Sequence, residues 1–141
     1  MRIRDLMTSD PVTCGPDTAI VAAARLMAER DIGAIPAVDN DSSRRPIGVI
    51  TDRDITTRIV AKGENPGDLT VRDAMTSETV TVTVDSSVED ASREMAEKQV
   101  RRLIVVDQDG AIRGVVAQAD LALHASVENT GAVVKEISEP N

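Results

Sequence analysis

The sequence predicts an α+β fold made of two similar β-α-β-β-α halves that pack through their sheets. An internal repeat is the first reason: residues 3–39 align without a gap with residues 71–107. The second reason is length. The chain has 141 residues, and a half of roughly 60 residues would bury too little surface to be stable alone. The third reason is the order of elements, which is the same in both halves and places helices over one side of each sheet.

Identical residues at equivalent positions support the repeat. They include Arg4/Arg72, Asp5/Asp73, Met7/Met75, Thr8/Thr76, Asp17/Asp85 and Val38/Val106. After two additional residues in the 40–46 turn of the first half, Gly48–Thr51 matches Gly114–Ala117, and Asp54 matches Asp120. The predicted parts are repeat 1 at 1–62, a linker at 63–69, repeat 2 at 70–125, and a C-terminal tail at 126–141. The tail is either a short docked helix or disordered.

Each half begins with a short helical or turn segment, at Arg4–Met7 and Arg72–Met75. A short strand follows, at Val12–Cys14 in the first half and at Val80–Val84 in the second. Next comes a helix, which Asp17 and Thr18 open in the first half and a capping-box pattern at Ser86–Glu89 opens in the second. Its apolar face in the first half has helical spacing: Ile20, Ala23, Ala24 and Met27.

The remainder of each half is a strand, a polar hairpin turn, a second strand and a closing helix. Ala34–Val38 and Leu103–Val106 are short apolar runs typical of buried strands. The second strand of the first half, Ile47–Ile50, is rich in β-branched residues. Thr51 then stands where a helix N-cap belongs, and Gly63 ends the closing helix.

Composition limits the classes of partner. The formal net charge is −8 and the sequence pI is about 4.6, which argues against nucleic acid or an anionic membrane, since both require a basic face. No apolar run approaches the ~20 residues that span a bilayer, and the first residues lack the apolar stretch of a signal peptide. We therefore expect a cytoplasmic protein with no nucleic-acid or membrane partner.

The single cysteine, Cys14, cannot form an internal disulfide and favours a reducing compartment. We expect it to be a small buried residue, with a redox role as the alternative. The chain has no Phe, Tyr or Trp, so a bound ring has to lie between aliphatic groups and backbone. No nucleophile–base pair, P-loop or metal-ligand spacing appears. The sequence therefore predicts a protein that is not an enzyme, with no metal site.

The stretch Gly48–Asp54, GVITDRD, carries the candidate binding chemistry. A strand that leads into a capped helix leaves N–H groups unpaired at the helix start, and these groups attract anions such as phosphate. The Thr51 hydroxyl adds a donor, and the Asp54 carboxylate can accept hydrogen bonds from two ribose hydroxyls. The alternative is that Thr51 and Asp54 only cap the helix.

Both halves carry the same series of motifs in the same order. The first has Met7-Thr8, Ile32–Asp39 and Gly48–Asp54, and the second has Met75-Thr76, Val100–Asp107 and Gly114–Asp120. Over residues 1–125 this pattern resembles a tandem cystathionine-β-synthase (CBS) domain pair, or Bateman module, here expected to stand alone. The resemblance implies a pseudo-two-fold pair with two clefts between the repeats, which commonly bind adenosine nucleotides, and a homodimer formed through helices.

Carried over to this sequence, the resemblance implies two unequal sites. In the first, Thr51 and Arg53 would meet phosphate, Asp54 the ribose, and Val49, Val80, Val100 and Arg101 would surround the rest of the ligand. In the second, Asp120 would hold the ribose, with Val115 beneath it, and Arg102 would reach the phosphate. The base there would meet Val12, Ile32, Gly33 and Ala34. In the second site, Ala117 stands in place of the Thr or Ser, so one phosphate donor is missing. In the first site, Ala34 is the counterpart of Arg102, so that cation is missing. We expect the Thr51 site to be the tighter one.

The resulting hypothesis is a sensor that binds an adenine nucleotide, most plausibly AMP with ATP or ADP in competition, and changes shape because the ligand bridges both repeats. No obligatory cofactor is implied. One alternative is an interaction or scaffold module whose clefts are empty or structural; another is binding of NAD or S-adenosylmethionine. A DNA-binding regulator is disfavoured by the net charge. The protein partner remains unknown.

Overall fold

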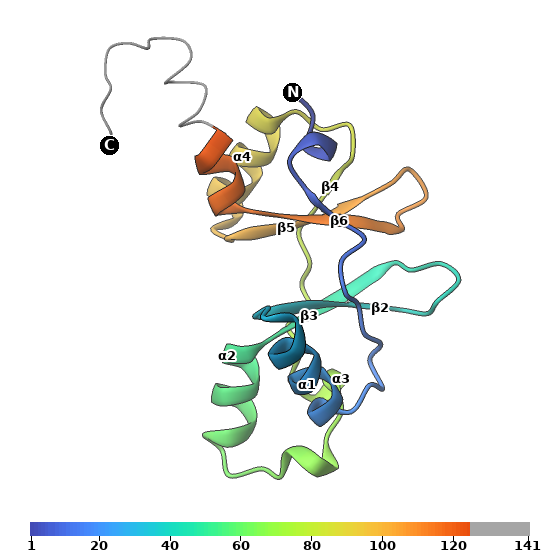
Figure 1. Ribbon diagram of the computed structural model, residues 1–141, viewed down its shortest axis with the longest axis vertical. Helices are drawn as coiled ribbons and strands as arrows, with labels where there is room; N and C mark the ends of the chain where they lie inside the picture. The colour runs from blue at the N-terminus through green and yellow to red at the C-terminus, as the bar shows by residue number, and fades with distance from the viewer. Residues whose placement is uncertain (125–141) are drawn as a thin grey trace.

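The computed structural model describes residues 1–124, so the predicted tail at 126–141 lies outside the described residues. Two α+β units lie one above the other, with their sheets facing each other and their helices on the outer sides (Figure 1). This arrangement confirms the predicted fold class of two β-α-β-β-α repeats packed through their sheets. No helix among residues 1–124 combines the length and the apolar character that a membrane crossing requires.

The first unit contains α1 (Ile20–Arg30), β2 (Ala34–Val38), β3 (Pro46–Thr51) and α2 (Asp52–Ile55). The helix α2 continues as a π-helical segment, η2 (Thr56–Val60), and Gly63 follows with a φ of 74°. α1 buries Ile20, Ala23 and Met27, the face that the apolar spacing predicted. β2 has the predicted bounds, and four of its five residues are buried, as expected for a short apolar strand.

The second unit contains β4 (Thr81–Thr83), α4 (Val88–Lys98), β5 (Arg102–Val106) and β6 (Ile112–Ala117), and residues 118–124 are again helical. Two short helices, η3 (Pro66–Asp68) and α3 (Val71–Ala74), precede it. The N-cap of α4 is Ser87, whose side chain accepts a hydrogen bond from the backbone N–H of Asp90. Ser86 instead accepts one from Thr83 N at 3.2 Å. The N-cap is therefore one residue later than the first serine of the predicted Ser86–Glu89 capping box.

The predicted strand at Val12–Cys14 is reduced to one isolated parallel bridge between Cys14 and Ala37. Its counterpart β4 is a regular strand that pairs in parallel with β5. Sequence explains the difference, since Pro11 and Pro16 flank the first segment and have no N–H to donate to a ladder. The equivalent positions of the second half carry Thr79 and Val84.

The two sheets are equivalent, although only one is fully paired. One has the strand order β1-β6-β5-β4, with β1 at Thr8–Ser9, and the other consists of β2 and β3. In the first, Thr8 pairs with Val115 on β6. In the second, an isolated bridge between Val49 and Thr76 holds the equivalent position. Together with the Cys14–Ala37 bridge, this contact completes the pseudo-two-fold relation between the sheets.

The N-terminal segments of the two repeats are exchanged between the units. Ile3, on η1 (Ile3–Asp5), is fully buried in the core that contains Leu103 and Val116 of the second unit. Val71, on α3, is fully buried in the core that contains Ile35 and Ile50 of the first unit. Figure 1 shows the chain beginning in the upper unit and then descending to the lower one.

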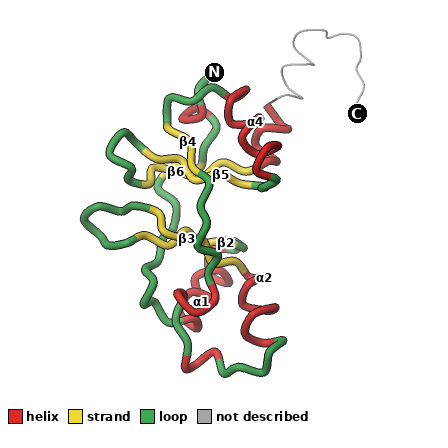
Figure 2. The backbone as a smooth tube through the Cα atoms, turned by 180° about the vertical axis from the view of Figure 1, so that it is seen from behind, coloured by secondary structure: helices red, strands yellow, loops and turns green. Residues whose placement is uncertain are grey.

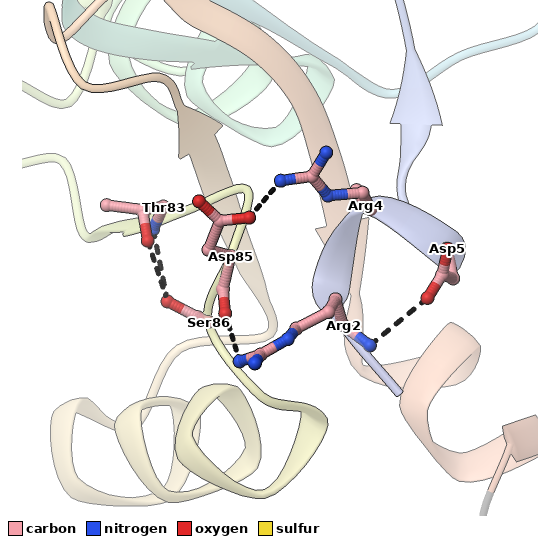
Figure 3. A network of polar contacts seen from close by, with 6 residues as sticks. All are labelled: Arg2, Arg4, Asp5, Thr83, Asp85 and Ser86. Atoms are coloured by element: carbon pink, nitrogen blue, oxygen red, sulfur yellow. Dashed lines mark hydrogen bonds and ion pairs between the residues drawn. The ribbon is translucent and has the colours of Figure 1, made fainter.

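Polar contacts hold the exchanged N-terminal segment against the turn before α4 (Figure 3). The guanidinium of Arg4 forms an ion pair with the Asp85 carboxylate. Arg2 donates from its guanidinium to the Asp85 carbonyl at 2.7 Å, and Ile3 N donates to the Ser86 carbonyl at 2.9 Å. The first residues of repeat 1 are therefore part of the packed structure of the second unit.

A third apolar cluster joins the two sheets. It consists of Val38, Ile104, Val106 and Ile112, with Val49 packed against it. The two hairpin turns lie on the same side of the molecule (Figure 2), and Ile112 N donates to the Arg44 carbonyl at 2.8 Å. The sheets are thus fixed at their hairpin ends, and the opposite ends of the strands are available to form a site.

Candidate functional site

Two clefts lie between the sheets, at the strand ends opposite the hairpin turns. The smaller, named here the Thr51 cleft, has a volume of about 260 Å³ and is lined by Val49, Thr51, Thr76, Glu78, Thr79, Val80, Val100, Arg101, Arg102 and Ile104. The larger, named here the Val115 cleft, has a volume of about 480 Å³ and is lined by Thr8, Asp10, Pro11, Val12, Arg30, Ile32, Gly33, Ala34, Pro36, Val49, Arg102, Ile104 and Val115.

The clefts are related by the repeat. One wall of the Val115 cleft comes from residues 8–12 and 32–36, and the equivalent wall of the Thr51 cleft comes from residues 76–80 and 100–104. The opposite wall carries Val115 in one cleft and its counterpart Val49 in the other. Each cleft therefore combines one wall from each repeat, as the sequence predicted for the two sites.

Two equivalent positions differ strongly in side-chain size between the cleft walls. Where the Val115 cleft has Gly33 and Ala34, the Thr51 cleft has Arg101 and Arg102. Two long side chains thus replace one hydrogen atom and one methyl group in otherwise equivalent walls. Ligand sites in proteins commonly have volumes of about 300–1,000 Å³. The Val115 cleft falls within that range, and the Thr51 cleft lies just below it.

The turn from β3 into α2 has the predicted capped geometry. The Thr51 hydroxyl accepts a hydrogen bond from Asp54 N at 3.0 Å, and Asp54 Oδ2 accepts one from Thr51 N at 3.0 Å. Asp54 is 8% exposed, and its Oδ1 lies 3.7 Å from the Nε atom of Arg58. The helix-cap alternative is therefore correct for the arrangement seen here. A binding role for the same two side chains remains a prediction.

The equivalent turn of the second unit is only half capped. Asp120 Oδ2 accepts a hydrogen bond from Ala117 N at 2.9 Å. Ala117 has no hydroxyl to accept the reciprocal bond from the Asp120 N–H. The two turns thus share the carboxylate and differ in the hydroxyl, which is the departure that the sequence showed.

The structure brings most of the predicted site residues together. The Thr51 cleft includes the predicted Val49, Thr51, Val80, Val100 and Arg101, and the Val115 cleft includes the predicted Val12, Ile32, Gly33, Ala34, Arg102 and Val115. Three predicted residues line neither cleft. Asp54 and Asp120 lie one turn into their helices with one carboxylate oxygen bound to backbone, and Arg53 is exposed.

The sequence reading missed several lining residues. Thr8 and Thr76 line the clefts because each pairs across to the sheet of the other repeat. Arg30, at the end of α1, lines the Val115 cleft, and its counterpart Lys98 lines neither. Thr8 and Thr76 are among the identical pairs of the repeat, which was the available signal. No sequence pattern indicated Arg30.

Three cations face the clefts without a carboxylate partner. Arg4, Arg58, Arg72, Arg93 and Arg113 each form an ion pair with an aspartate. By contrast, Arg30, Arg101 and Arg102 form no ion pair within residues 1–124. Because the chain as a whole is acidic, these side chains supply local positive charge at the clefts, as an anionic ligand requires.

Cys14 lies beside β2, in the core of the first unit, and lines neither cleft. It is 7% exposed, and its thiol lies 3.7 Å from the Pro36 carbonyl oxygen. Burial raises the pKa of the Cys14 thiol to about 11, because removal from water disfavours the thiolate. The prediction of a small buried residue is confirmed. Within residues 1–124, no three side chains of His, Cys, Asp or Glu are placed to hold a metal ion.

The comparisons with known proteins agree with this geometry. The CBS domain pattern matches residues 3–61 and 71–126. The CBS domain-containing protein YhcV of Bacillus subtilis is 39% identical over 140 residues, which are 99% of this chain and 96% of that protein.

Two solved structures share the fold. Hypoxic Response Protein I with two coordinated zinc ions has a TM-score of 0.77 and 32% identity, covering 88% of this chain and 98% of that one. CBSX2 in complex with AMP has a TM-score of 0.72 and 26% identity, covering 89% and 96%. The chain therefore belongs to the CBS domain family, as a tandem pair of CBS domains.

Proposed function

We propose that the chain is a regulatory module that binds an adenine nucleotide between its two repeats, AMP foremost, with ADP and ATP as competitors. The observation that carries the proposal is the composition of the Val115 cleft. Aliphatic residues from both repeats line it, including Val12, Ile32 and Val115, and two arginines without carboxylate partners stand beside them. Such a site suits an aromatic base joined to an anion, in a chain that has no aromatic ring for stacking.

The cavity volumes favour the Val115 cleft as the first to be occupied. The hydroxyl of Thr51 predicts the opposite order, because a hydrogen bond to a charged group contributes about 1.5–3 kcal/mol. However, the Thr51 cleft has a volume of about 260 Å³, against about 480 Å³ for the Val115 cleft. We therefore propose that the Val115 cleft is occupied first and that the Thr51 cleft is the weaker site.

In the proposed complex, the ribose lies near the carboxylate that follows each strand. Asp120 uses Oδ2 for the Ala117 N–H, which leaves its other oxygen to accept from a ribose hydroxyl. The base contacts Val12 and Ile32 of repeat 1, and Val115 of repeat 2 lies beneath the ligand. The ligand would therefore stabilise the arrangement in which the repeats are close together, and it would shift the equilibrium by its difference in affinity for open and closed forms.

We also propose a homodimer formed through the helical faces. Leu123, at the end of the described chain, is 66% exposed. A shallow, mainly apolar hollow lies between α4 and the helical residues 118–124, lined by Ser92, Met95, Ala96, Gln118, Leu121 and Ala122. A dimer that buries these residues would connect the ligand-dependent change at the clefts to the contact between the two copies.

Calorimetry and thermal shift with AMP, ADP, ATP, NAD and S-adenosylmethionine test the proposal on the full chain. AMP is expected to bind saturably, and Asp120→Ala is expected to weaken the tighter site by at least about tenfold. Asp54→Ala is the matched variant in the other cleft and is expected to affect the weaker site only. Absence of binding by all five compounds would overturn the proposal in favour of a scaffold module. Preference for NAD or S-adenosylmethionine over the three adenine mononucleotides would overturn the choice of AMP.

A further inference from the structure

Arg102 lines both clefts, and it breaks the symmetry of the pair. It begins β5, opposite Ala117 on β6, and appears in the linings of the Thr51 cleft and of the Val115 cleft. Its counterpart in repeat 1 is Ala34, which lines the Val115 cleft alone. One guanidinium is therefore available where a symmetric pair would have two.

The boundary between the clefts is formed by three residues common to both linings: Val49, Ile104 and Arg102. Val49 and Ile104 belong to the packed contact between the sheets and are fixed there. Arg102 is exposed and forms no ion pair within residues 1–124. Among the three, only Arg102 carries charge and a long side chain free to lie in either cleft.

A guanidinium binds phosphate through a planar fork of donors, often with two parallel hydrogen bonds. One such fork cannot hold two phosphates in different clefts with that geometry. The first phosphate to engage Arg102 therefore withdraws it from the other cleft. The Thr51 cleft then keeps Arg101, and the Val115 cleft keeps Arg30.

We propose that Arg102 is a shared phosphate-recognition residue that makes the two clefts compete for anionic ligands and leaves them independent for neutral ones. The inference rests on the proposed function, because it requires a nucleotide in the clefts. The expected penalty on the second phosphate is about 10- to 100-fold in affinity, the contribution of one hydrogen bond to a charged group. Adenosine, which lacks the phosphate, is expected to show no penalty.

The test measures AMP and adenosine binding at each cleft separately. Methyl NMR signals of Val80 and Val100 report the Thr51 cleft, and those of Val12 and Ile32 report the Val115 cleft. Ala34→Phe places an uncharged ring in the Val115 cleft, so that the Thr51 cleft can be titrated with Arg102 free. The AMP affinity of the Thr51 cleft is expected to be at least tenfold higher in Ala34→Phe than in the unmodified protein saturated at the Val115 cleft.

Arg102→Ala separates sharing from simple repulsion between two bound phosphates. If Arg102 is shared, Arg102→Ala is expected to abolish the difference in AMP affinity of the Thr51 cleft between protein with and without Ala34→Phe. Under repulsion, it persists or grows, and that result would overturn the proposal. Arg101→Ala is the matched control: it is expected to weaken the Thr51 cleft and preserve the difference. Thermal melts confirm that each variant is folded.

The remaining outcomes distinguish the two proposals. If neither AMP nor adenosine binds at either cleft, the proposed function fails and this inference fails with it. If AMP binds both clefts and the Thr51 cleft has the same affinity with the Val115 cleft filled or blocked, the proposed function stands and the sharing of Arg102 is wrong.

Discussion

Thr51 and Asp54 satisfy each other at the start of α2, each side chain accepting a hydrogen bond from the backbone N–H of the other at 3.0 Å. The same residues are the predicted ligands of phosphate and ribose in the Thr51 cleft. The cap therefore holds the hydroxyl and the carboxylate in place before any ligand arrives. In the second unit, Asp120 makes one of these two bonds, to Ala117 N.

The cap predicts opposite effects on the free energy of unfolding for Thr51→Ala and Ala117→Thr, which are reciprocal changes at equivalent positions of the two turns. Thr51→Ala removes a side-chain acceptor and is expected to lower the free energy of unfolding by about 1 kcal/mol. Ala117→Thr supplies the missing acceptor to the Asp120 N–H and is expected to raise it by about 0.5–1 kcal/mol. Urea unfolding measures both. Thr51→Ser keeps the hydroxyl and serves as the control; a loss equal to that of Thr51→Ala would show that the methyl group, not the cap, stabilises the turn.

Two glycines mark where the exchanged segments cross the sheets. A Cβ at Gly48 would lie 2.7 Å from Met75 Sδ and 2.8 Å from the Thr76 carbonyl oxygen. A Cβ at Gly114 would lie 2.5 Å from Met7 Sδ and 2.8 Å from the Thr8 carbonyl oxygen. The sulfur atoms can move, but the carbonyls belong to backbone that is paired with the neighbouring strand.

Gly48→Ala and Gly114→Ala are therefore each expected to destabilise the protein by roughly 1–3 kcal/mol, as overpacking does. Gly15→Ala is the matched control, because the nearest atom to its Cβ is Thr18 Oγ1 at 3.8 Å. Thermal unfolding of the three variants gives the comparison. Equal stability of Gly48→Ala and Gly15→Ala would contradict the close approach at Gly48.

The exchange of N-terminal segments predicts which part of the protein each core substitution loosens. Ile3→Ala removes a fully buried side chain from the core of the second unit and is expected to cost about 2–5 kcal/mol. Native-state hydrogen exchange should accelerate first at β5, although Ile3 belongs to repeat 1 in sequence. Val71→Ala is the reciprocal variant and should accelerate exchange first at β2. Acceleration of β2 by Ile3→Ala would contradict the exchanged packing.

The buried thiol of Cys14 predicts a loss of stability at high pH. Its pKa is about 11 in the folded protein, against an ordinary value near 9. Since the folded pKa is the higher one, the contribution is complete below pH 9 and is lost as the pH rises towards 11. The expected loss over that window is on the order of 2–3 kcal/mol.

Urea unfolding between pH 8 and pH 11 measures this loss. The chain has no tyrosine and three lysines, so few other side chains titrate there. Cys14→Ala is expected to remove most of the slope. Alkylation by iodoacetamide at pH 8 should be slow in the native protein and fast in urea; rapid native labelling would show that the thiol is accessible.

The repeat alignment predicted most of the fold because both halves carry the same local signals. β2 was predicted residue for residue, and Thr51 was correctly identified as a cap. The Val12–Cys14 strand was predicted from its apolar pattern, but with Pro11 and Pro16 beside it the segment forms only one bridge. The exchange of N-terminal segments was not predictable: Arg4–Thr8 and Arg72–Thr76 are so alike that either could complete either core.

The site residues that belong to the sequence motifs were predicted. The contributions of long side chains that extend into a cleft from elsewhere in the fold were missed. Val12, Ile32 and Val115 were identified from their places in the motifs. Arg102 was assigned to one cleft, because no periodicity indicates that a side chain reaches across a pseudo-two-fold axis. Arg30 lies at the end of a helix whose other signals concern its buried face, so nothing marked it as a lining residue.

The crossing of the chain between units has one more consequence, for a polypeptide cut in the 63–69 connection. The N-terminal fragment would carry Ile3 away from the core that it fills, and the C-terminal fragment would do the same with Val71. Neither fragment contains a complete interior, yet each supplies the piece that the other lacks. A nicked molecule would therefore remain a two-fragment complex, and the halves would be expected to fold only when produced together.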